Sequence, residues 1–338
     1  MRALVVRGSG QIGLEERDAP AVPAGCVLVR PTVVGLCGTD LEIIDGKLDP
    51  AYLRLPLVIG HEWSGVVVDA GTSPEAPPAG SRVVVEGIVP CRHCPDCVAG
   101  DTNRCRTYDE FGFIRDGAAA DLVVAPAELV HVLGPDVSAE SGALVEPAAV
   151  VLRALLRASP RPGLRILVVG DGTVGLLAVT LARLWSPAAV TLLGARVDQR
   201  DLAAAAGADR FVTTPGDAGD GYDLVVEAAG TGPAVSSAFG AVGRGGTVVL
   251  LGLAGHGLQV ALPIDDLVNG DVTVLGSFGY TATAWARVVD LLGTGRISLD
   301  FLVTHRFRLE DWASAVTALR APTGARGKVL LEISSPSS

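Results

Sequence analysis

The sequence predicts an α/β protein with two domains: a β-rich domain and a doubly wound domain built on a parallel sheet. The chain has 338 residues, which is long for a single core. Residues 1–148 read as short Val-rich runs between Gly and Pro, whereas strand-like and helix-like segments alternate over 149–283. The tail, 284–338, returns to mixed helix and strand, and we assign it to the first domain.

The β-rich domain is predicted from five runs of apolar residues, each bounded by turn residues. They read ALVVR, CVLVRPTVVG, WSGVVVDAG, SRVVVEG and ADLVVAP. Runs of this length, rich in β-branched residues, are typical of strands. The residues between them are expected to form long, irregular connections.

The doubly wound domain begins where helical periodicity first appears. In ALVEPAAVVLRALLRA (143–158) apolar residues recur at helical spacing, and Pro147 suits the first turn. A strand over 165–169, a glycine turn and a helix follow, and the alternation continues to VTVLGSF. This order is typical of a parallel sheet covered by helices. The tail holds the helix ATAWARVVDLLGTG, a strand near THRFRL, a further helix and the strand GKVLLEI.

Composition narrows the range of functions. The formal net charge is -10 and no basic run occurs, which argues against binding a nucleic-acid backbone. The N-terminus lacks an apolar run and a cleavage site, so no signal peptide is predicted. The apolar stretch TVVLLGLAGHGLQVALPI contains Gly, His, Gln and Pro, and we interpret it as buried strands and loops, not as a membrane span. The expected location is cytoplasmic, where thiols stay reduced.

The segment CRHCPDCVAGDTNRC concentrates four of the six cysteines. Cys91, Cys94 and Cys97 are separated by two residues each, and Cys105 follows. This spacing lets thiolates converge on one tetrahedral ion, and four of them leave no open position, so a structural zinc is predicted in the lobe 91–105. A disulfide pair, free thiols and an iron–sulfur cluster are the alternatives. Cys26 is interpreted as a small, buried apolar residue.

A second, mixed set of ligand types is spread over the first domain. CGTD brings Cys37, GHEWSG brings His61 and Glu62, and ALVEPAAV brings Glu146. Three protein ligands with one open position is the arrangement of a catalytic zinc. On spacing alone the grouping is only suggestive, because a single Cys and a single His are commonly packing residues.

The glycine turn VVGDGTVG has the GxGxxG spacing of a dinucleotide site and stands between a strand and a helix. Gly170 permits the tight turn, Gly172 lets the backbone approach the pyrophosphate, and Gly175 packs the helix on the strand. The unpaired amides at the start of the helix, at Thr173 and Val174, attract the pyrophosphate.

The end of the next strand predicts which nucleotide binds. VTLLGARVDQR lacks the carboxylate that holds both ribose hydroxyls of NAD. Gly194 leaves room for a 2′-phosphate, Arg196 can pair with it, and Arg200 is one helical turn away. NADP is therefore the preferred cofactor, and NAD, with Asp198 at the ribose, is the alternative. Asp171, inside the glycine turn, is expected to point outward from the phosphates.

These motifs stand in the order found in the zinc-containing medium-chain dehydrogenase/reductases, and the chain resembles that family over nearly its whole length. The pair Glu146–Pro147, where other alcohol dehydrogenases have a cysteine, is similar to the polyol, glucose and threonine dehydrogenase branch. The resemblance implies a GroES-like catalytic domain, a Rossmann domain and an active site in the cleft between them. It also implies that Ala229, Leu251 and Gly252 line the nicotinamide, although strand-end packing explains these residues equally well.

Carried over position by position, the resemblance implies ligands for a catalytic zinc. Cys37 and His61 bind it directly, and of Glu62 and Glu146 one binds while the other exchanges with it or holds a water molecule. Asp40 would accept the free N–H of His61 and fix its tautomer.

Three residues near Cys37 have more than one reading. Thr39 would take the proton from the substrate hydroxyl, while simple capping of the turn is the alternative for Thr39 and Asp40. Relatives often carry a histidine where this chain has Glu42. Glu42 either relays a proton to solvent, binds substrate hydroxyls or is a solvated surface carboxylate.

The predicted activity is reversible oxidation of a secondary alcohol to a ketone by hydride transfer to NAD(P), with two zinc ions per chain. Glu42, Tyr52 and Glu110, with Asp45, are candidates to bind the hydroxyls of a sugar, polyol or cyclitol. A simple alcohol or a threonine-like amino alcohol is the alternative substrate, and a non-catalytic NADPH-binding protein is the alternative of another class. A homodimer or homotetramer is expected, joined through a sheet edge such as VTVLGSF.

Overall fold

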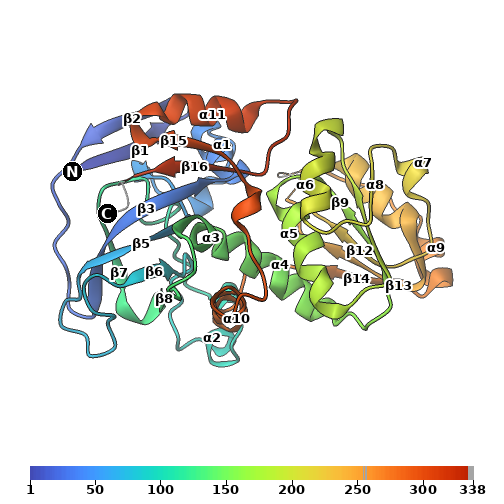
Figure 1. Cartoon of the computed structure of the whole chain (residues 1–338), viewed down its shortest axis with the longest axis horizontal. Helices are drawn as coiled ribbons and strands as arrows, with labels where there is room; N and C mark the ends of the chain where they lie inside the picture. Colours follow the sequence, from blue (N-terminus) through green and yellow to red (C-terminus); the bar gives the residue numbers. More distant parts are fainter. Residues whose placement is uncertain (254, 256, 334–338) are drawn as a thin grey trace. The chain divides into compact units, whose positions relative to one another are not determined.

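The computed structural model describes residues 1–253, 255 and 257–333, and the chain divides into two compact units. Unit 1 comprises Met1–Glu146, Thr281–Ala321 and the described residues from Lys328 on. Unit 2 comprises Pro147–Tyr280 and Pro322–Gly327. The fold class is the one the sequence predicts: a β-rich unit and a doubly wound parallel-sheet unit (Figure 1).

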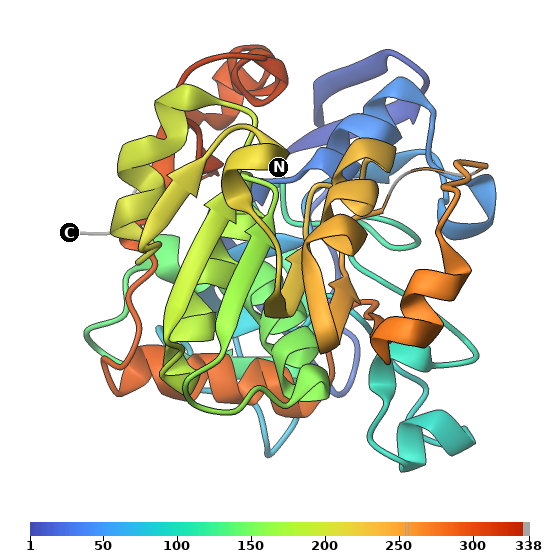
Figure 2. The ribbon, with the colours of Figure 1, turned by 90° about the vertical axis from the view of Figure 1, so that its right-hand side faces the viewer.

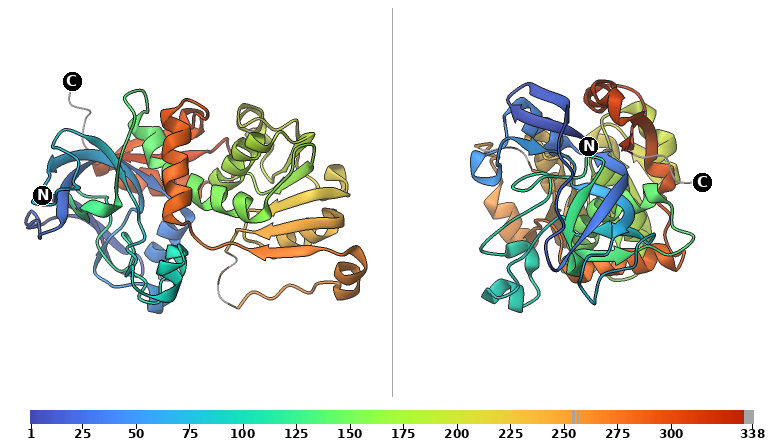
Figure 3. Two further views of the ribbon diagram at one scale, coloured as in Figure 1. Left: turned by 90° about the horizontal axis from the view of Figure 1, so that it is seen from below. Right: turned by 90° about the vertical axis from the view of Figure 1, so that its left-hand side faces the viewer.

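Unit 1 is built on a seven-stranded, mostly antiparallel sheet and a three-stranded sheet (Figure 3). The large sheet has the order β15 (Val303–Arg308), β16 (Lys328–Glu332), β3 (Cys26–Leu36), β5 (Glu62–Asp69), β6 (Arg82–Val85) and β8 (Val130–Val132), with β7 (Val123–Pro126) also paired to β3. The small sheet has the order β2 (Gln11–Glu16), β1 (Arg2–Gly8) and β4 (Leu57–Val58).

Strand β3 shows how the sequence sets burial in this sheet. Val27 and Val29 are fully buried, whereas Arg30 is exposed. Such alternation is typical of a strand that has one face toward solvent. From Pro31 on, every residue is buried. A proline lacks the N–H that a ladder needs, and the pairing with β5 shifts register between Pro31 and Val33. The second half of β3 is therefore carried into the core, where it leads to Cys37.

The helices of unit 1 range from one turn to about three turns. They are α1 (Gly38–Asp45), α2 (Pro95–Val98), α3 (Ala139–Ala143), α10 (Ala282–Gly293) and α11 (Trp312–Arg320). Helix α4 (Val145–Ala158) starts in unit 1, with Glu146 in its first turn, and continues along unit 2. The predicted helix of 143–158 is therefore present, with Pro147 near its start, where a missing N–H costs nothing.

Unit 2 is a six-stranded parallel sheet with helices on both faces (Figure 2). Its strand order is β11 (Arg210–Val212), β10 (Ala189–Leu193), β9 (Arg165–Val169), β12 (Tyr222–Glu227), β13 (Val242–Leu250) and β14 (Thr273–Gly276). Its helices are α5 (Thr173–Ala182), α6 (Arg200–Ala205), α7 (Pro215–Ala218), α8 (Gly232–Ala241) and α9 (Ile264–Gly270). The strand order reverses between β9 and β12, so their carboxyl ends form the crevice where such sheets bind ligands.

One apolar stretch departs from expectation. TVVLLGLAGHGLQVALPI is interpreted above as buried strands and loops, and β13 does end at Leu250 as a strand. Beyond it, Leu253 and Leu258 are 72% and 49% exposed. The reading as buried is wrong for these two side chains. The residues 254 and 256 of this stretch lie outside the described part of the chain.

Candidate active site and cofactor site

The four clustered cysteines converge in unit 1. Their sulfur atoms all lie within 4.8 Å of one another, and none is in a disulfide. Backbone amides donate to two of them: Cys94 N–H to Cys91 Sγ at 3.3 Å, and Cys91 N–H to Cys105 Sγ at 3.2 Å. A backbone hydrogen bond from His93, followed by the one from Cys94, lowers the pKa of Cys91 to about 5, whereas burial raises that of Cys97 to about 12. A divalent cation among the four would hold all of them as thiolates.

The mixed set is assembled by strand pairing. In the antiparallel ladder Gly35 of β3 lies opposite Glu62 of β5. The end of one strand and the start of the other therefore place Cys37 beside His61 and Glu62. One donor atom from each of these three residues lies within 4.8 Å of the others. Residues separated by about two dozen positions thus form one group because of register, not because of local spacing.

Asp40 and His61 stand next to each other without completing a hydrogen bond. One carboxylate oxygen of the fully buried Asp40 accepts the Cys37 N–H at 2.8 Å. The other, Oδ1, is 3.6 Å from His61 Nδ1, and neither atom has a hydrogen-bond partner among the described residues. Burial lowers the pKa of His61, but Asp40 and then Cys37 raise it by more than burial lowers it. The resulting pKa of His61 is therefore well above the usual value. Both proposed roles of Asp40, capping and orienting His61, are compatible with this position.

Glu62 forms an ion pair inside the protein. Lys328, the first residue of β16, donates from Nζ to Glu62 Oε2 and also to the Leu36 carbonyl at 3.2 Å. Both side chains are almost fully buried. Burial lowers the pKa of Lys328, yet Glu62, Cys37 and Glu146 raise it above its ordinary value, so the ammonium is retained.

Glu146 and Glu110 complete an acidic shell around His61. Neither belongs to the three-residue donor group, but both act electrostatically on it. Burial raises the pKa of Glu146 to about 8, with Glu62 and Glu110 adding to the rise and His61 opposing it. Burial likewise raises the pKa of Glu110 to about 7.

These residues fit a bound zinc ion. Thiolate, imidazole and carboxylate are its preferred ligands. The buried Nδ1 of His61 faces an Asp40 carboxylate oxygen, and neither atom has a hydrogen-bond partner among the residues that the structure describes. This is the pairing that orients a metal-bound histidine. The buried carboxylates around His61 outnumber the single buried ammonium group there, that of Lys328. A bound cation would lower the free-energy cost of burying these carboxylates in their charged form.

The predicted substrate residues occupy different surroundings. Glu110 is buried and accepts a hydrogen bond from the Tyr108 hydroxyl. Thr39 Oγ1 lies 3.7 Å from Cys37 Sγ. Tyr52 is half exposed and Glu42 is half-buried. Asp45, by contrast, is committed to Arg320 and Lys47 at the surface.

The glycine turn of unit 2 has the close approaches that its spacing predicts. Helix α5 starts at Thr173, with Gly172 as its N-cap, and the Thr173 hydroxyl donates to the Gly327 carbonyl at 3.0 Å. A Cβ at Gly175 would stand 1.8 Å from the carbonyl oxygen of Gly170. Only glycine therefore lets the helix pack on this turn. Val174, the second residue of α5, is half-buried.

Asp171 does not point outward, which corrects the prediction for this residue. It is 8% exposed, and its Oδ2 accepts the N–H groups of Ala195 and Arg196, both at 2.9 Å. Its Oδ1 accepts from the Arg196 guanidinium at 3.0 Å. The expectation failed because unpaired amides at the end of β10 attract the carboxylate more than solvent does. Arg200, in contrast, lies over the Phe211 ring, 5.6 Å from its centroid.

Glu227, at the end of β12, organises the remaining predicted cofactor residues. Its buried side chain accepts the N–H groups of Ala229 and Gly230, both at 2.8 Å. Its backbone carbonyl accepts from Leu251 at 2.9 Å and Gly252 at 3.2 Å. One residue therefore fixes both strand-end loops, and their positions serve structure as well as any contact with a nucleotide.

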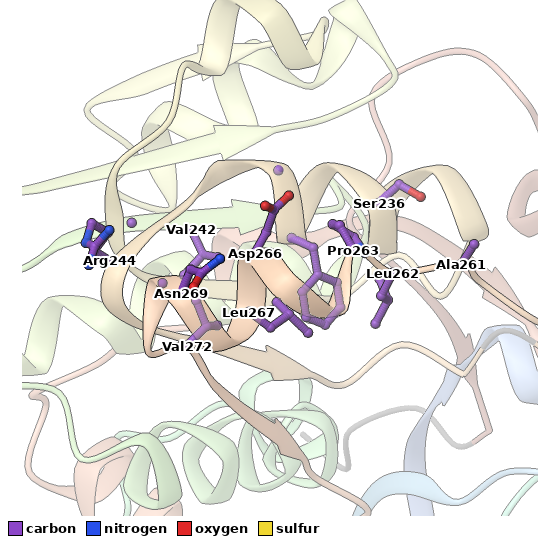
Figure 4. Close-up of a pocket in the computed structure, with 14 residues that line it drawn as sticks. Ser236, Val242, Arg244, Ala261, Leu262, Pro263, Asp266, Leu267, Asn269 and Val272 are labelled. Carbon is purple, nitrogen blue, oxygen red and sulfur yellow. The ribbon is translucent and has the colours of Figure 1, made fainter.

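A pocket of about 450 Å³ lies elsewhere in unit 2 (Figure 4). Helix α8, the start of β13 and helix α9 line it, with Phe239, Arg244, Asp266 and Asn269 among its residues. It contains no predicted site residue. We therefore assign it no part in the chemistry.

Sequence reasoning missed three contributors to these sites. Lys328, Tyr108 and Glu227 each hold another site residue in place. Lys328 carried a signal, since it is one of only two lysines and directly precedes an apolar strand. The partners of Tyr108 and Glu227 depend on folding back of the chain, which no local pattern shows.

Comparison with known proteins identifies the family. Residues 23–135 match the model for the alcohol dehydrogenase GroES-like domain, and residues 173–294 match that for zinc-binding dehydrogenases. A thermostable alcohol dehydrogenase from Pyrobaculum aerophilum, solved with cobalt and zinc, is 30% identical with a TM-score of 0.90, covering 98% of this chain and 99% of that one. The chain belongs to the zinc-containing medium-chain dehydrogenase/reductase family. It is an NAD(P)-linked, zinc-dependent oxidoreductase, as the motifs predict.

Two further relatives of this dehydrogenase cover its whole architecture. D-xylulose reductase A of Aspergillus niger is 28% identical over 96% of this chain and 95% of its own length. A Sinorhizobium meliloti protein, provisionally assigned as a zinc-binding dehydrogenase and bound to NADP, is 30% identical with a TM-score of 0.91 and covers 98% of this chain and 99% of that one. No helix in the described part of the dehydrogenase is both long and apolar enough to cross a membrane.

Proposed function

We propose that this dehydrogenase interconverts a secondary alcohol of the sugar, polyol or cyclitol type and its ketone, with NADP as the preferred cofactor. The observation that carries the proposal is the group of the half-buried Cys37 with the buried His61 and Glu62, close to further carboxylates. Zinc bound there would act as a Lewis acid that lowers the pKa of a substrate hydroxyl. The nicotinamide would accept the hydride from the carbinol carbon.

The chain's own residues would position the reactants and move the proton. Thr39, two residues after Cys37, is the candidate to take the hydroxyl proton of the substrate. Asp40 would orient His61 through Nδ1, because its Oδ1 stands 3.6 Å away with no other partner among the described residues. For Asp40 this role requires only a small closure of the existing 3.6 Å separation.

Lys328 would fix the orientation of Glu62. The ammonium binds one carboxylate oxygen and leaves the other available to a cation. Glu146, whose pKa is raised to about 8 by burial, lies outside the three-residue group and would be the carboxylate that exchanges or holds water. This division of labour follows from which carboxylate has a buried cationic partner.

The polyol-type substrate is supported by two polar side chains near the same group, the buried Glu110 and the half-buried Tyr108. Glu110 and Tyr108 form a hydrogen-bonded pair that acts electrostatically on His61 and Glu146. A second hydroxyl of a polyol could be bound by the remaining acceptor positions of such a pair. The D-xylulose reductase relative, by its name, acts on a compound of this class.

We also propose that the chain forms a dimer through the β14 edge of unit 2. Strand β14 ends the sheet and has Val274 42% exposed, and Phe278 just after it is 51% exposed. Ile264 and Val268 of α9, one turn apart, are 62% and 73% exposed. A sheet edge that pairs with no further strand in the described part of the chain, together with exposed apolar side chains in the same unit, is suited to pairing with a second copy.

An activity panel tests the proposed reaction. Sugars, polyols and cyclitols, with simple alcohols and threonine for comparison, are assayed with NADP and with NAD on the wild type and on Cys37→Ala. We expect turnover of a polyol-type substrate that the substitution abolishes. Turnover confined to simple alcohols would overturn the substrate class, and unchanged turnover in Cys37→Ala would overturn the metal assignment.

A further inference from the structure

The second residue of the glycine turn has an unexpected place. Asp171 is 8% exposed and turned toward the carboxyl end of β10, where the adenosine ribose is expected if the dinucleotide binds at this turn as proposed. Four interactions hold its carboxylate: the N–H groups of Ala195 and Arg196, and the Nε and Nη2 atoms of Arg196. This is a preformed anion site that already contains an anion of the chain itself.

The donors that Asp171 uses are the ones a phosphate group would need. Consecutive backbone amides and a guanidinium are the typical ligands of a phosphate. The 2′-phosphate of NADP must bind at the end of β10, whereas NAD presents only hydroxyls there. The Asp171 carboxylate therefore competes for the same donors and repels the phosphate charge.

Gly194 supports this reading of Asp171. A Cβ at Gly194 would stand 2.7 Å from both Cβ and Oδ2 of Asp171 and 2.8 Å from the Phe211 ring. The absence of a side chain at 194 is thus required by the carboxylate that lies there. The missing acidic residue at the end of β10, taken above as a sign of NADP, is replaced in space by an acidic residue from the preceding turn.

Two arginines keep the site attractive to phosphate nevertheless. The Arg196 side chain is only 12% exposed, and its Nη1 is buried without a hydrogen-bond partner among the described residues. Arg326 is close enough that burial and the Arg196 charge lower its pKa while Asp171 raises it. The Gln199 side chain connects the backbones of Asp171 and Arg326. It donates to both of their carbonyls and accepts the Arg326 N–H at 2.7 Å. Two cations thus face one carboxylate.

We propose that Asp171 is a specificity-determining residue that weakens binding of the 2′-phosphate, so that the dehydrogenase accepts NAD as well as NADP. Arg196 and Arg326 attract the phosphate, and Asp171 must release Arg196 before the phosphate can bind. NAD meets no such competition, because its 2′-hydroxyl can donate a hydrogen bond to the Asp171 carboxylate without displacing it.

Binding of reduced nucleotides to Asp171→Asn tests the proposal without any turnover. The asparagine keeps the size and an acceptor oxygen but removes the charge. Titrating NADPH and NADH by fluorescence, we expect NADPH to bind about tenfold more tightly than to the wild type and NADH to change by no more than about threefold. The fragment 2′,5′-ADP, compared with 5′-AMP, should show the same gain. An unchanged NADPH to NADH ratio would overturn the proposal.

Asp201→Asn is the matched control, because this exposed carboxylate stands in the first turn of α6, directly after the same loop, and has no role in the proposed site. Its nucleotide ratio should not change; a gain equal to that of Asp171→Asn would show a general charge effect and overturn the assignment. If Asp171→Asn does not fold, Arg196→Gln should lose affinity for NADPH at least tenfold more than for NADH, and equal losses would contradict the account. Failure of the wild type to bind either nucleotide would instead count against the proposed function.

Discussion

The two cysteine-containing groups of unit 1 are built in opposite ways. The lobe of Cys91, Cys94, Cys97 and Cys105 comes from one short segment, has four identical donors and is stabilised by its own backbone amides. The group of Cys37, His61 and Glu62 comes from two paired strands, has three different donors and is surrounded by charged side chains from elsewhere in the fold. A local cluster suits a closed structural ion, whereas a mixed, shared one leaves a position open for chemistry.

The largest effect is expected at the mixed group. Cys37→Ser should lower kcat/KM for the preferred substrate by roughly three orders of magnitude or more, because the reacting hydroxyl loses its Lewis acid. Thermal unfolding should shift little. Cys26→Ser, which alters a half-buried cysteine outside both groups, is the control and should keep its activity. A Cys37→Ser enzyme with near-normal turnover would erase the distinction between the two groups.

Loss of a lobe cysteine should act on stability instead. Cys97→Ala removes one of four ligands, and we expect the free energy of unfolding in urea to fall by about 3 kcal/mol or more. The kcat of the remaining folded enzyme should change far less than in Cys37→Ser. The neighbouring Val98→Ala, at a side chain that is 75% exposed, is the control. The lobe would be catalytic after all if kcat collapsed while stability held.

The buried ion pair sharpens the comparison, since the lobe has nothing similar. Lys328→Met leaves Glu62 buried without its cation and should lower the free energy of unfolding by about 3 kcal/mol. The double variant Glu62→Gln with Lys328→Met should lose less than the sum of the single changes, as urea melts of all four proteins would show. Strict additivity would mean that the pair is not coupled. Lys47→Met, at the surface, is the control.

The smallest effect concerns pH. Burial raises the pKa of Glu110 to about 7 from 4.5, so the folded state holds a proton that the unfolded state has lost. The stability due to this group is fully present below about pH 4.5 and is lost as the pH rises through 7. Wild type should therefore lose about 2 kcal/mol relative to Glu110→Gln between pH 5 and pH 8, measured by urea unfolding. A difference that stays flat would place Glu110 in contact with water; Glu128→Gln, at the surface, should give such a flat line.

The fold was largely predictable, and the reasons are local. The alternation of strands and helices from Arg165 on, and the glycine turn at Gly170, are short-range patterns that periodicity detects. The four-cysteine lobe was predictable for the same reason. In contrast, the contact between Cys37 and His61 depends on a strand register, which only the family resemblance supplied in advance.

Other features could not be predicted because they depend on tertiary placement. The side chain of Asp171 was expected to point outward, but backbone amides at the end of β10 bind it. Glu62 pairs with Lys328, which is more than two hundred residues away in the sequence and lies on β16 of the same seven-stranded sheet. Leu253 and Leu258 belong to a stretch as apolar as a buried core, and both side chains are nevertheless exposed. Sequence patterns define elements, whereas pairing between distant elements decides the charge state of a site.

Stepwise removal of zinc tests the central claim most directly. A chelator is added to the wild-type enzyme while bound zinc per chain, turnover and secondary structure are followed together. We predict two zinc ions per chain: loss of the first abolishes turnover with little loss of structure, and loss of the second accompanies unfolding. Turnover that survives loss of the first ion, or a single ion per chain in the active enzyme, would contradict it.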